Sequence, residues 1–286
     1  MKIRIITVPY DSAHFRARMG AGPDRLLSAG LADRLQNNGH RVQVEECTPP
    51  AAALNTEIST AFALNHVISA HVREAGTAGE FPVILAGNCV TSVGVLAGLG
   101  GDAIRLVWFD AHGDFNTPET TLGGFLDGMA LSIATGNCFT QIASRLDGFR
   151  AADEKDVVLI GARDLDPLEA ELLASSAITM VATGEMSERL DSLSQHSASS
   201  TADVYVHLDL DVLDPSQGRA NQFAVDGGLS VQQAESALRL IGARCHLRAA
   251  SISAYDPSHD VDGRICDAAL RLIEVIAEVA ADPEAG

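Results

Sequence analysis

Two short acidic segments each follow an apolar run of the kind that forms a buried strand. Their charged residues are Asp110, His112 and Asp114 in the first segment, and Asp209 and Asp211 in the second. In an extended chain, residues two and four apart face the same way, so each set converges on one point. Carboxylates gathered there would repel one another if the site were empty, and with imidazole they suit Mn²⁺, Zn²⁺ or Fe²⁺. The spacing therefore predicts a metal site.

Strands and helices alternate around these two segments. The predicted strands are Ile3–Val8, Val42–Glu46, Pro82–Ala86, Ile104–Asp110, Asp156–Ile160, Ile178–Val181, Val204–Asp209 and Ala249–Tyr255. The predicted helices are Pro23–Leu35, Glu57–Glu74, Val90–Leu99, Phe125–Ala134, Pro167–Ala174, Val231–Ile241 and Ile265–Ala280. This alternation predicts an α/β protein, a three-layer α/β/α sandwich around a mainly parallel eight-stranded sheet. Ligands of such sheets bind beyond the carboxyl ends of the strands, where both acidic segments lie.

The composition of the chain argues against several classes of protein. The chain has 286 residues, of which 47% are hydrophobic, and we expect a single domain over residues 1–286 with Ser192–Thr201 as a surface loop. Lys plus Arg number 20 and Asp plus Glu number 38, and this charge of −18 argues against nucleic-acid or membrane-surface partners. Five scattered cysteines indicate no disulfide framework. With neither a signal peptide nor a membrane span, a cytoplasmic location is expected.

Several segments resemble those of one enzyme family. The run DAHGDFNTP at 110–118 resembles the DAHxDxNTP motif of the arginase, agmatinase and formiminoglutamase family (the ureohydrolases). The run DLDVLDP at 209–215 resembles its DxDxxDP motif, and GAGP at 20–23 and LIGARDLDPLE at 159–169 resemble two further segments. The order and spacing hold from about residue 1 to residue 280. The resemblance implies an arginase-like fold and a homo-oligomer, either a trimer or a hexamer.

The resemblance also implies a chemistry. Family members hold two Mn²⁺ ions, and by motif Asp110 and Asp209 would bridge them, with His112 and Asp211 completing one ion and Asp114 binding the other. A hydroxide between the ions attacks the amidine carbon of a small guanidino, hydroxyguanidino or formimino compound, and a C–N bond is cleaved. Asp114 would relay the proton to the leaving amine.

Two further residues match family positions that contact an amino-acid substrate. They are Asn116 and Asp166, which would bind its carboxylate and amino ends. Asn116 precedes Thr-Pro and Asp166 precedes Pro167 at a helix start, so a loop cap and a helix-start aspartate are alternative roles.

Two residues depart from the family pattern close to the metal motifs. Cys89 stands where the family has a histidine ligand, and its thiolate would shift metal preference towards Zn²⁺ or Fe²⁺. The alternative is a small buried cysteine beside a site that lacks one ligand. Asp127 stands where a histidine donates a proton; it would donate a proton, pair with a cationic substrate or serve a helix start. His207 is expected to be a hydrogen-bonded core residue.

A third departure concerns the substrate. Ala254 stands where arginases have the glutamate that holds the guanidinium, so Asp127, Glu119 or Asp256 supplies the charge or the substrate is not a plain guanidine. A cysteine variant of this kind resembles the N-hydroxy-arginine amidinohydrolase branch of the family. Two alternatives remain open: a metal-dependent amide deacylase on the same fold, and a catalytically altered metal-binding subunit or regulator.

Overall fold

The computed structural model describes residues 1–50, 56–100, 104–184 and 202–281. The predicted Ser192–Thr201 loop lies outside these residues. No helix within them is long and apolar enough to cross a membrane.

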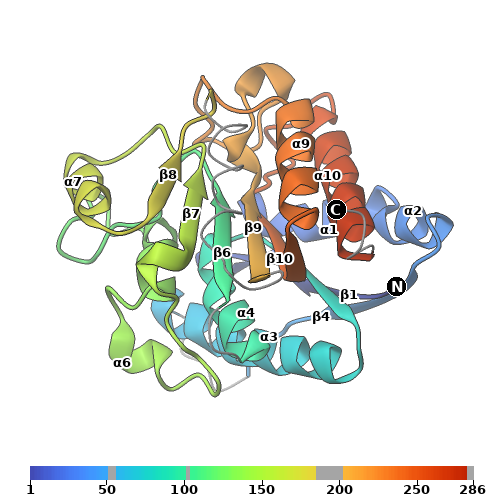
Figure 1. The fold of residues 1–286 in the computed structure, drawn as a ribbon, viewed down its shortest axis with the longest axis horizontal. Helices are drawn as coiled ribbons and strands as arrows, with labels where there is room; N and C mark the ends of the chain where they lie inside the picture. The colour runs from blue at the N-terminus through green and yellow to red at the C-terminus, as the bar shows by residue number, and fades with distance from the viewer. Residues whose placement is uncertain (51–55, 101–103, 185–201, 282–286) are drawn as a thin grey trace.

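One parallel sheet organises the chain (Figure 1). Its order from edge to edge is β4 (Arg41–Glu46), β1 (Lys2–Val8), β5 (Phe81–Ala86), β10 (Cys245–Ser253), β9 (Ala202–Asp209), β6 (Arg105–Phe109), β7 (Val157–Ile160) and β8 (Thr179–Val181). Every pairing between neighbours is parallel. The eight predicted strands are confirmed, and so is the α/β class. A strand such as β5 is buried along its whole length, as expected when helices cover both faces of a parallel sheet.

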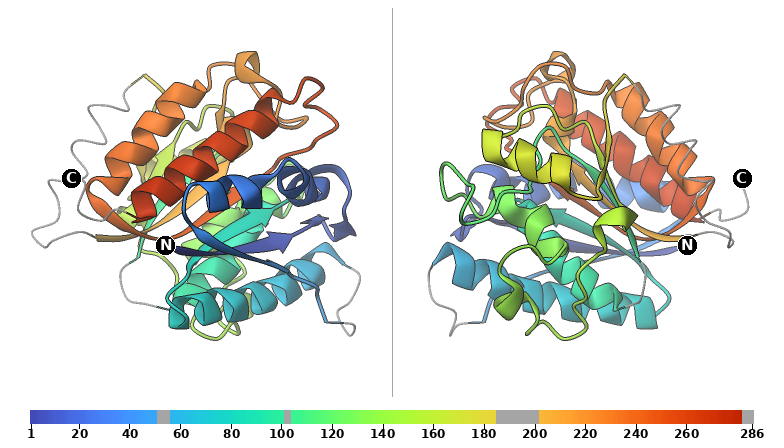
Figure 2. Two further views of the ribbon diagram at one scale, coloured as in Figure 1. Left: turned by 90° about the vertical axis from the view of Figure 1, so that its right-hand side faces the viewer. Right: turned by 60° about the vertical axis from the view of Figure 1, so that its left-hand side comes forward.

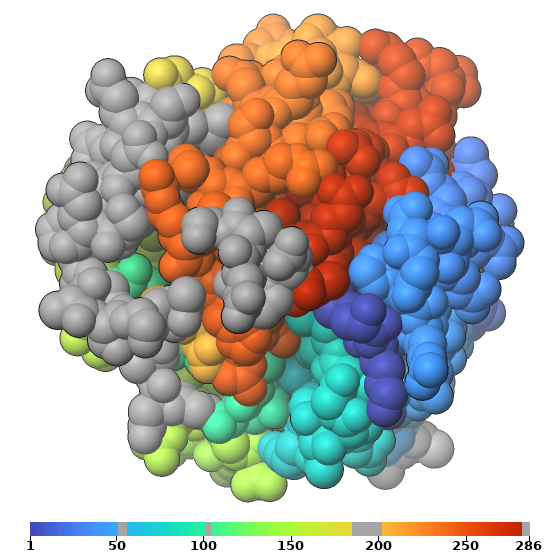
Figure 3. Space-filling model, turned by 45° about the vertical axis from the view of Figure 1, so that its right-hand side comes forward, coloured from blue at the N-terminus to red at the C-terminus, as the bar shows by residue number. Residues whose placement is uncertain are grey.

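Helices cover the two faces (Figure 2). On one face lie α1 (Gly22–Ser28), α2 (Leu31–Asn37), α9 (Val231–Gly242) and α10 (Arg264–Ala281); on the other lie α3 (Glu57–Thr77), α4 (Ser92–Leu99) and α5 (Ala130–Ala134). Successive strand residues point to opposite faces, so Val83 and Leu85 join the first core while Ile84 and Ala86 join the second. In Figure 3, α9, α10 and the α1–α2 region form adjoining bands.

Several details differ from the prediction, including the expected helix Phe125–Ala134, which is the 3-10 turn Asp127–Met129 followed by α5. The expected helix Pro23–Leu35 is two helices, because the chain turns at Gly30, whose φ of 89° is the left-handed conformation that favours glycine. A small hairpin of β2 (Tyr10–Asp11) and β3 (His14–Phe15), and the short α6 (Thr140–Ala143), were not predicted. α7 (Pro167–Ser175) begins as expected after Asp166, which forms a capping box with Glu169.

Candidate metal centre and substrate cavity

Four neighbouring strands bring the chemical residues to one edge of the sheet. Cys89 follows β5 and Ala254 follows β10, which is the next strand in the sheet. Asp209 ends β9 and is followed by Asp211, and Asp110 follows β6. β5 and β6 follow one another along the chain, yet β10 and β9 lie between them in the sheet. The crossovers on either side of that gap run in opposite directions, which is where parallel sheets open a crevice for ligands.

A cavity of about 290 Å³ lies at this edge. Its lining includes five of the six predicted metal ligands and the three other predicted site residues, namely Cys89, His112, Asp114, Asp209, Asp211, Asn116, Asp127 and Asp166. The sixth ligand, Asp110, is 1% exposed and lies beneath them. The structure therefore brings together all nine residues singled out from the sequence.

Asp110, His112 and Asp211 form one group of potential ligands, whose donor atoms lie within 4.8 Å of one another. Nδ1 of His112 is 3.2 Å from Oδ1 of Asp110 and 3.6 Å from Oδ2 of Asp211. Burial alone would lower the pKa of His112, but its bonds to the two carboxylates outweigh it and raise the pKa to about 12. Burial raises the pKa of Asp211, whereas the His112 contact and Asn221 bring it down to about 2.

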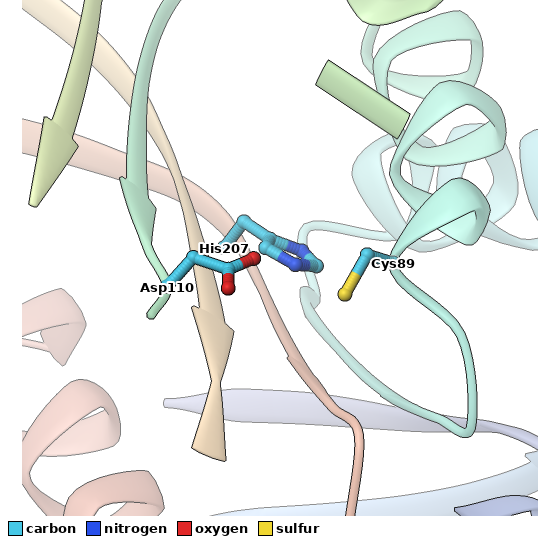
Figure 4. Close-up of side chains that lie close together, drawn as sticks. All are labelled: Cys89, Asp110 and His207. Atoms are coloured by element: carbon cyan, nitrogen blue, oxygen red, sulfur yellow. The ribbon is translucent and has the colours of Figure 1, made fainter. Parts of the chain in front are cut away.

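Cys89 approaches the same group of ligands from the 3-10 turn Cys89–Thr91, which follows β5. Its Sγ donates to Oδ2 of Asp209 at 3.0 Å and lies 3.1 Å from Oγ of Ser253. Figure 4 shows the sulfur pointing towards Asp110 and His207, with which it forms a second group of potential ligands within 4.8 Å. Burial, and then the charges of Asp209 and other nearby aspartates, raise the pKa of the thiol well above its ordinary value.

His207 is buried on β9 and behaves as a core residue, as expected. Its ring stacks on Trp108 with centroids 3.8 Å apart, and its Nδ1 lies 2.7 Å from Oγ of Ser251. Burial lowers its pKa to about 3, so the imidazole is neutral. Nε2 of the ring lies 3.3 Å from Oγ of Ser253, which connects His207 to Cys89.

The backbone brings the ligands together by loops rather than by extended strands. β6 ends at Phe109, and Asp114 has a left-handed φ of 48°. Asp211 lies in a short 3-10 turn, Leu210–Val212, whose backbone N–H donates to Oδ1 of Asp209 at 2.8 Å. The ligands therefore do not follow one another along an extended chain, and the local geometry predicted from the sequence is wrong. The side chains converge because these turns re-aim them after the strands end.

Asp114 provides the test of whether the residues fit a cation. It is 6% exposed, and within the described residues its Oδ2 is buried without a hydrogen-bond partner. Burial, and then the charges of Asp110, Asp127 and Asp209, raise its pKa well above the ordinary value. Burial and neighbouring carboxylates raise the pKa of Asp209 in the same way. A buried carboxylate oxygen without a partner, among further carboxylates, fits a site made for cations.

The carboxylate of Asp127 is bonded to the turn that carries Cys89. Oδ1 accepts from the backbone N–H of Val90 and Oδ2 from Nδ2 of Asn88, each at 2.8 Å. Burial raises its pKa to about 7, although these bonds act in the opposite direction. Of the three carboxylates proposed to compensate for Ala254, Asp127 lines the cavity, whereas Glu119 and Asp256 are not among its lining residues.

The two predicted substrate contacts are bonded to each other. Nδ2 of Asn116 donates to Oδ2 of Asp166 at 3.1 Å, and both residues line the cavity. Ala254 also lines it, is 3% exposed and has a left-handed φ of 60°. Next to it, the Gly22 backbone packs so closely that an added Cβ would lie 2.4 Å from the carbonyl oxygen of Tyr255. Gly22, the second glycine of the GAGP segment, is thus required by its close approach to the Tyr255 backbone.

Sequence reasoning missed four residues around the cavity. Asn221 contacts Asp211, and Trp108 donates from Nε1 to Oδ2 of Asp110 at 3.0 Å. Phe125 and Phe223 face each other with ring centroids 5.8 Å apart, and Phe223 is 39% exposed. Trp108 and Phe125 lie in the predicted strand Ile104–Asp110 and the predicted helix Phe125–Ala134, whereas Asn221 and Phe223 lie in an irregular loop with no recognisable signal.

Comparisons with known proteins agree on one family. The family model described as "Arginase family" matches residues 1–278. An arginase from Bacillus caldovelox is 27% identical over 290 residues, covering 95% of this chain and 96% of that protein. An N(omega)-hydroxy-L-arginine amidinohydrolase from Streptomyces lavendulae is 34% identical over 226 residues, covering 74% of this chain and 76% of that protein. The solved structure of the Bacillus caldovelox arginase superposes with a TM-score of 0.86, 25% identity and coverage of 96% and 97%.

Proposed function

The chain belongs to the arginase family, and from this premise we propose that it is a metal-dependent hydrolase that cleaves a C–N bond of a small guanidino, hydroxyguanidino or formimino compound. The observation that supports this most directly is Oδ2 of Asp114, a buried carboxylate oxygen with no partner among the described residues. Asp114 lines a cavity that is also lined by His112, Asp209 and Asp211.

The residues present fit a pair of divalent cations. Asp110, Asp114, Asp209 and Asp211 with His112 would hold them, and Cys89 would be the remaining ligand. Mn²⁺ suits the carboxylates and imidazole, while the thiolate favours Zn²⁺ or Fe²⁺. Such cations supply a water whose pKa is low enough to ionise near neutral pH.

The protein's own groups would orient the reaction. Among the described residues Oδ2 of Asp114 has no hydrogen-bond partner, so it would accept the proton of the attacking water and deliver it to the leaving nitrogen. Asn116 and Asp166 line the same cavity and would contact the part of the substrate remote from the amidine. In this arrangement the chain positions both ends of a small molecule about one reacting carbon.

Ala254 favours an N-hydroxyguanidine within this substrate class. A methyl group cannot pair with a guanidinium, and a cavity without a carboxylate at that position suits an amidine that is less basic and less charged. The amidinohydrolase relative from Streptomyces lavendulae is named for a hydroxylated arginine. We extend the family resemblance to a homo-oligomer, a trimer or a hexamer, and to a cytoplasmic location.

Metal analysis tests the cation site. Protein purified without chelator should carry divalent transition metal, and the double variant Asp110→Ala with Asp209→Ala should lose it. A double variant of two exposed aspartates, Asp153→Ala with Asp262→Ala, removes the same charge and should retain the metal. An absence of bound transition metal in the parent protein would overturn the proposal.

A substrate panel separates the proposed reaction from its rivals. Urea or hydroxyurea release from arginine, N-hydroxy-arginine and agmatine reports the guanidine reaction, and formamide release from a formimino compound reports its close relative. Amine release from acylated amines without either product would indicate an amide deacylase. Metal binding without turnover on any substrate would indicate a regulatory subunit.

A further inference from the structure

The Asp127 carboxylate is fully engaged with three consecutive residues of one turn. Besides the 2.8 Å bonds from Nδ2 of Asn88 and from the Val90 amide, the backbone N–H of Cys89 bonds to it. The side chain is 6% exposed. Both oxygens therefore already accept N–H donors, which is the arrangement of an ionised acceptor that holds a backbone in place.

The turn needs such an acceptor. Residues Cys89–Thr91 form a 3-10 helix that runs directly into α4, and Asn88 at its N-cap makes no side-chain cap bond. The first N–H groups of a helix have no partner within the helix and must be satisfied from outside. Asp127, 37 residues further along the chain from Val90, supplies that partner and places a negative charge at the helix start.

The other face of the turn is tied to the β2–β3 hairpin. Oδ1 of Asn88 accepts from the backbone N–H of Ser12 at 2.7 Å. Its Nδ2 also lies 3.4 Å from Oδ1 of Asp11, whose Oδ2 pairs with Nε of Arg18 at 2.9 Å. Asn88 is thus held on two sides, and the backbone of Cys89 has little freedom left.

The position of the Cys89 sulfur depends on the position of this turn. Sγ of Cys89 contacts Oδ2 of Asp209 at 3.0 Å and Oγ of Ser253 at 3.1 Å, so a shift of the turn by a fraction of that distance would break both contacts. We propose that Asp127 is a positioning residue that clamps the Asn88–Val90 turn and so holds the Cys89 sulfur at the metal centre. The two departures from the family pattern form one unit, and Asp127 acts on Cys89 rather than donating a proton.

Asp260 offers a matched control elsewhere in the fold. It is 7% exposed and accepts from the backbone N–H of Ile265 and of Cys266 at 3.1 and 2.9 Å, and from the Tyr255 hydroxyl. Cys266 and Cys89 are each 2% exposed. Each aspartate therefore holds the backbone of one buried cysteine, and the two sites can be tested against each other.

The experiment measures alkylation of each cysteine by iodoacetamide in the native, metal-free protein, followed by peptide mass spectrometry. Asp127→Asn should raise the labelling rate of Cys89 about tenfold or more, because one oxygen becomes an N–H₂ group facing donors and local opening becomes easier. Cys266 should keep its rate. Asp260→Asn should do the reverse, and Asn88→Ala, which removes one donor, should raise Cys89 labelling by a smaller factor.

Two outcomes would overturn the proposal: Cys89 labelling that rises no more in Asp127→Asn than in Asp260→Asn, or Cys89 and Cys266 rising together in both Asp127→Asn and Asn88→Ala. This measurement needs no turnover and is independent of the proposed function. A second readout rests on that function: in Co²⁺-loaded protein, a thiolate-to-cobalt absorption band should be lost in Cys89→Ser, weakened in Asp127→Asn and kept in Asp260→Asn. A parent protein without the band would remove Cys89 as a ligand while leaving the labelling result to decide the clamp.

Discussion

Nδ2 of Asn221 donates to Oδ2 of Asp211 at 3.1 Å, which joins an irregular loop to a proposed metal ligand. The same amide donates to the carbonyl oxygen of Ala254 at 2.8 Å, and its Oδ1 accepts from the backbone N–H of Phe223 at 2.8 Å. Asn221 is 1% exposed. One buried side chain therefore sets the orientation of a ligand, a strained residue and an aromatic residue of the cavity.

We expect Asn221→Ala to weaken metal binding by about 10- to 100-fold, because partners that orient a ligand contribute that much to metal affinity. It should also cost about 2 to 4 kcal/mol of stability, since two buried polar groups and one partly buried backbone N–H lose a partner. Metal titration and urea unfolding measure the two effects.

Ser230→Ala is the control for stability loss alone. Ser230 caps α9, and its loss should cost about 1 kcal/mol with metal affinity unchanged. Equal metal affinity in Asn221→Ala and the parent protein would contradict the orienting role.

The strands of the sheet could be predicted from the sequence because each strand is marked by its own short run of residues. Runs such as Leu106–Phe109 are apolar on both faces, and buried parallel strands are the structures that have this pattern. The cap of α9 is equally local, because Ser230 and Gln233 are three residues apart and form a capping box. The helix break at Gly30 was missed because a single glycine within a helical pattern is often tolerated.

The site was predictable only as far as its residues lie at strand ends. Asp110 and Asp209 were found for that reason, and the turns that aim Asp114 and Asp211 were not foreseen. Asn221 does not follow a strand, and its role depends on an irregular loop that bonds to Asp211 and Ala254, the residues after β9 and β10. The partners of Asp127 were likewise invisible, because contacts between residues 88 and 127 depend on packing of distant segments.

We expect Gly87→Ala to destabilise the protein by about 2 to 3 kcal/mol through overpacking against rigid backbone. A Cβ there would lie 2.2 Å from the carbonyl oxygen of Tyr10 and 2.8 Å from the amide nitrogen of Gly20. Gly76→Ala is the matched control, because it lies in α3 with nothing within 4 Å of the new Cβ. That variant should gain about 0.5 to 1 kcal/mol in urea unfolding. Similar values for the two variants would refute the close approach.

We expect Phe223→Ala to raise KM several-fold and to change kcat little. The ring lies at the cavity beside Phe125 and meets the ring of His112 edge-on, with centroids 6.4 Å apart. The ring carries no group that can transfer a proton, so its loss removes binding that is equal in the ground and transition states. Phe15→Ala, an exposed aromatic outside the cavity lining, should leave both constants unchanged. Loss of kcat alone would exclude a simple binding role.

Without metal, the stability of the protein should fall as the pH rises. The pKa values of Asp110, Asp114 and Asp209 are raised in the metal-free fold, chiefly by burial. The native state then binds more protons than the unfolded chain above about pH 4, so stability falls as pH rises. His112, whose pKa is raised to about 12, adds to the fall above about pH 6.5.

Cations bind the deprotonated groups, so their stabilising effect grows over the same range. Urea unfolding from pH 4.5 to 7.5 should therefore give two curves, roughly equal at the acid end, that separate as pH rises. The double variant Asp114→Asn with Asp209→Asn should flatten the metal-free curve, because it removes two of the titrating groups. A metal-free parent whose stability is constant or increases across this range would show that burial and neighbouring charges do not raise the pKa values of these carboxylates.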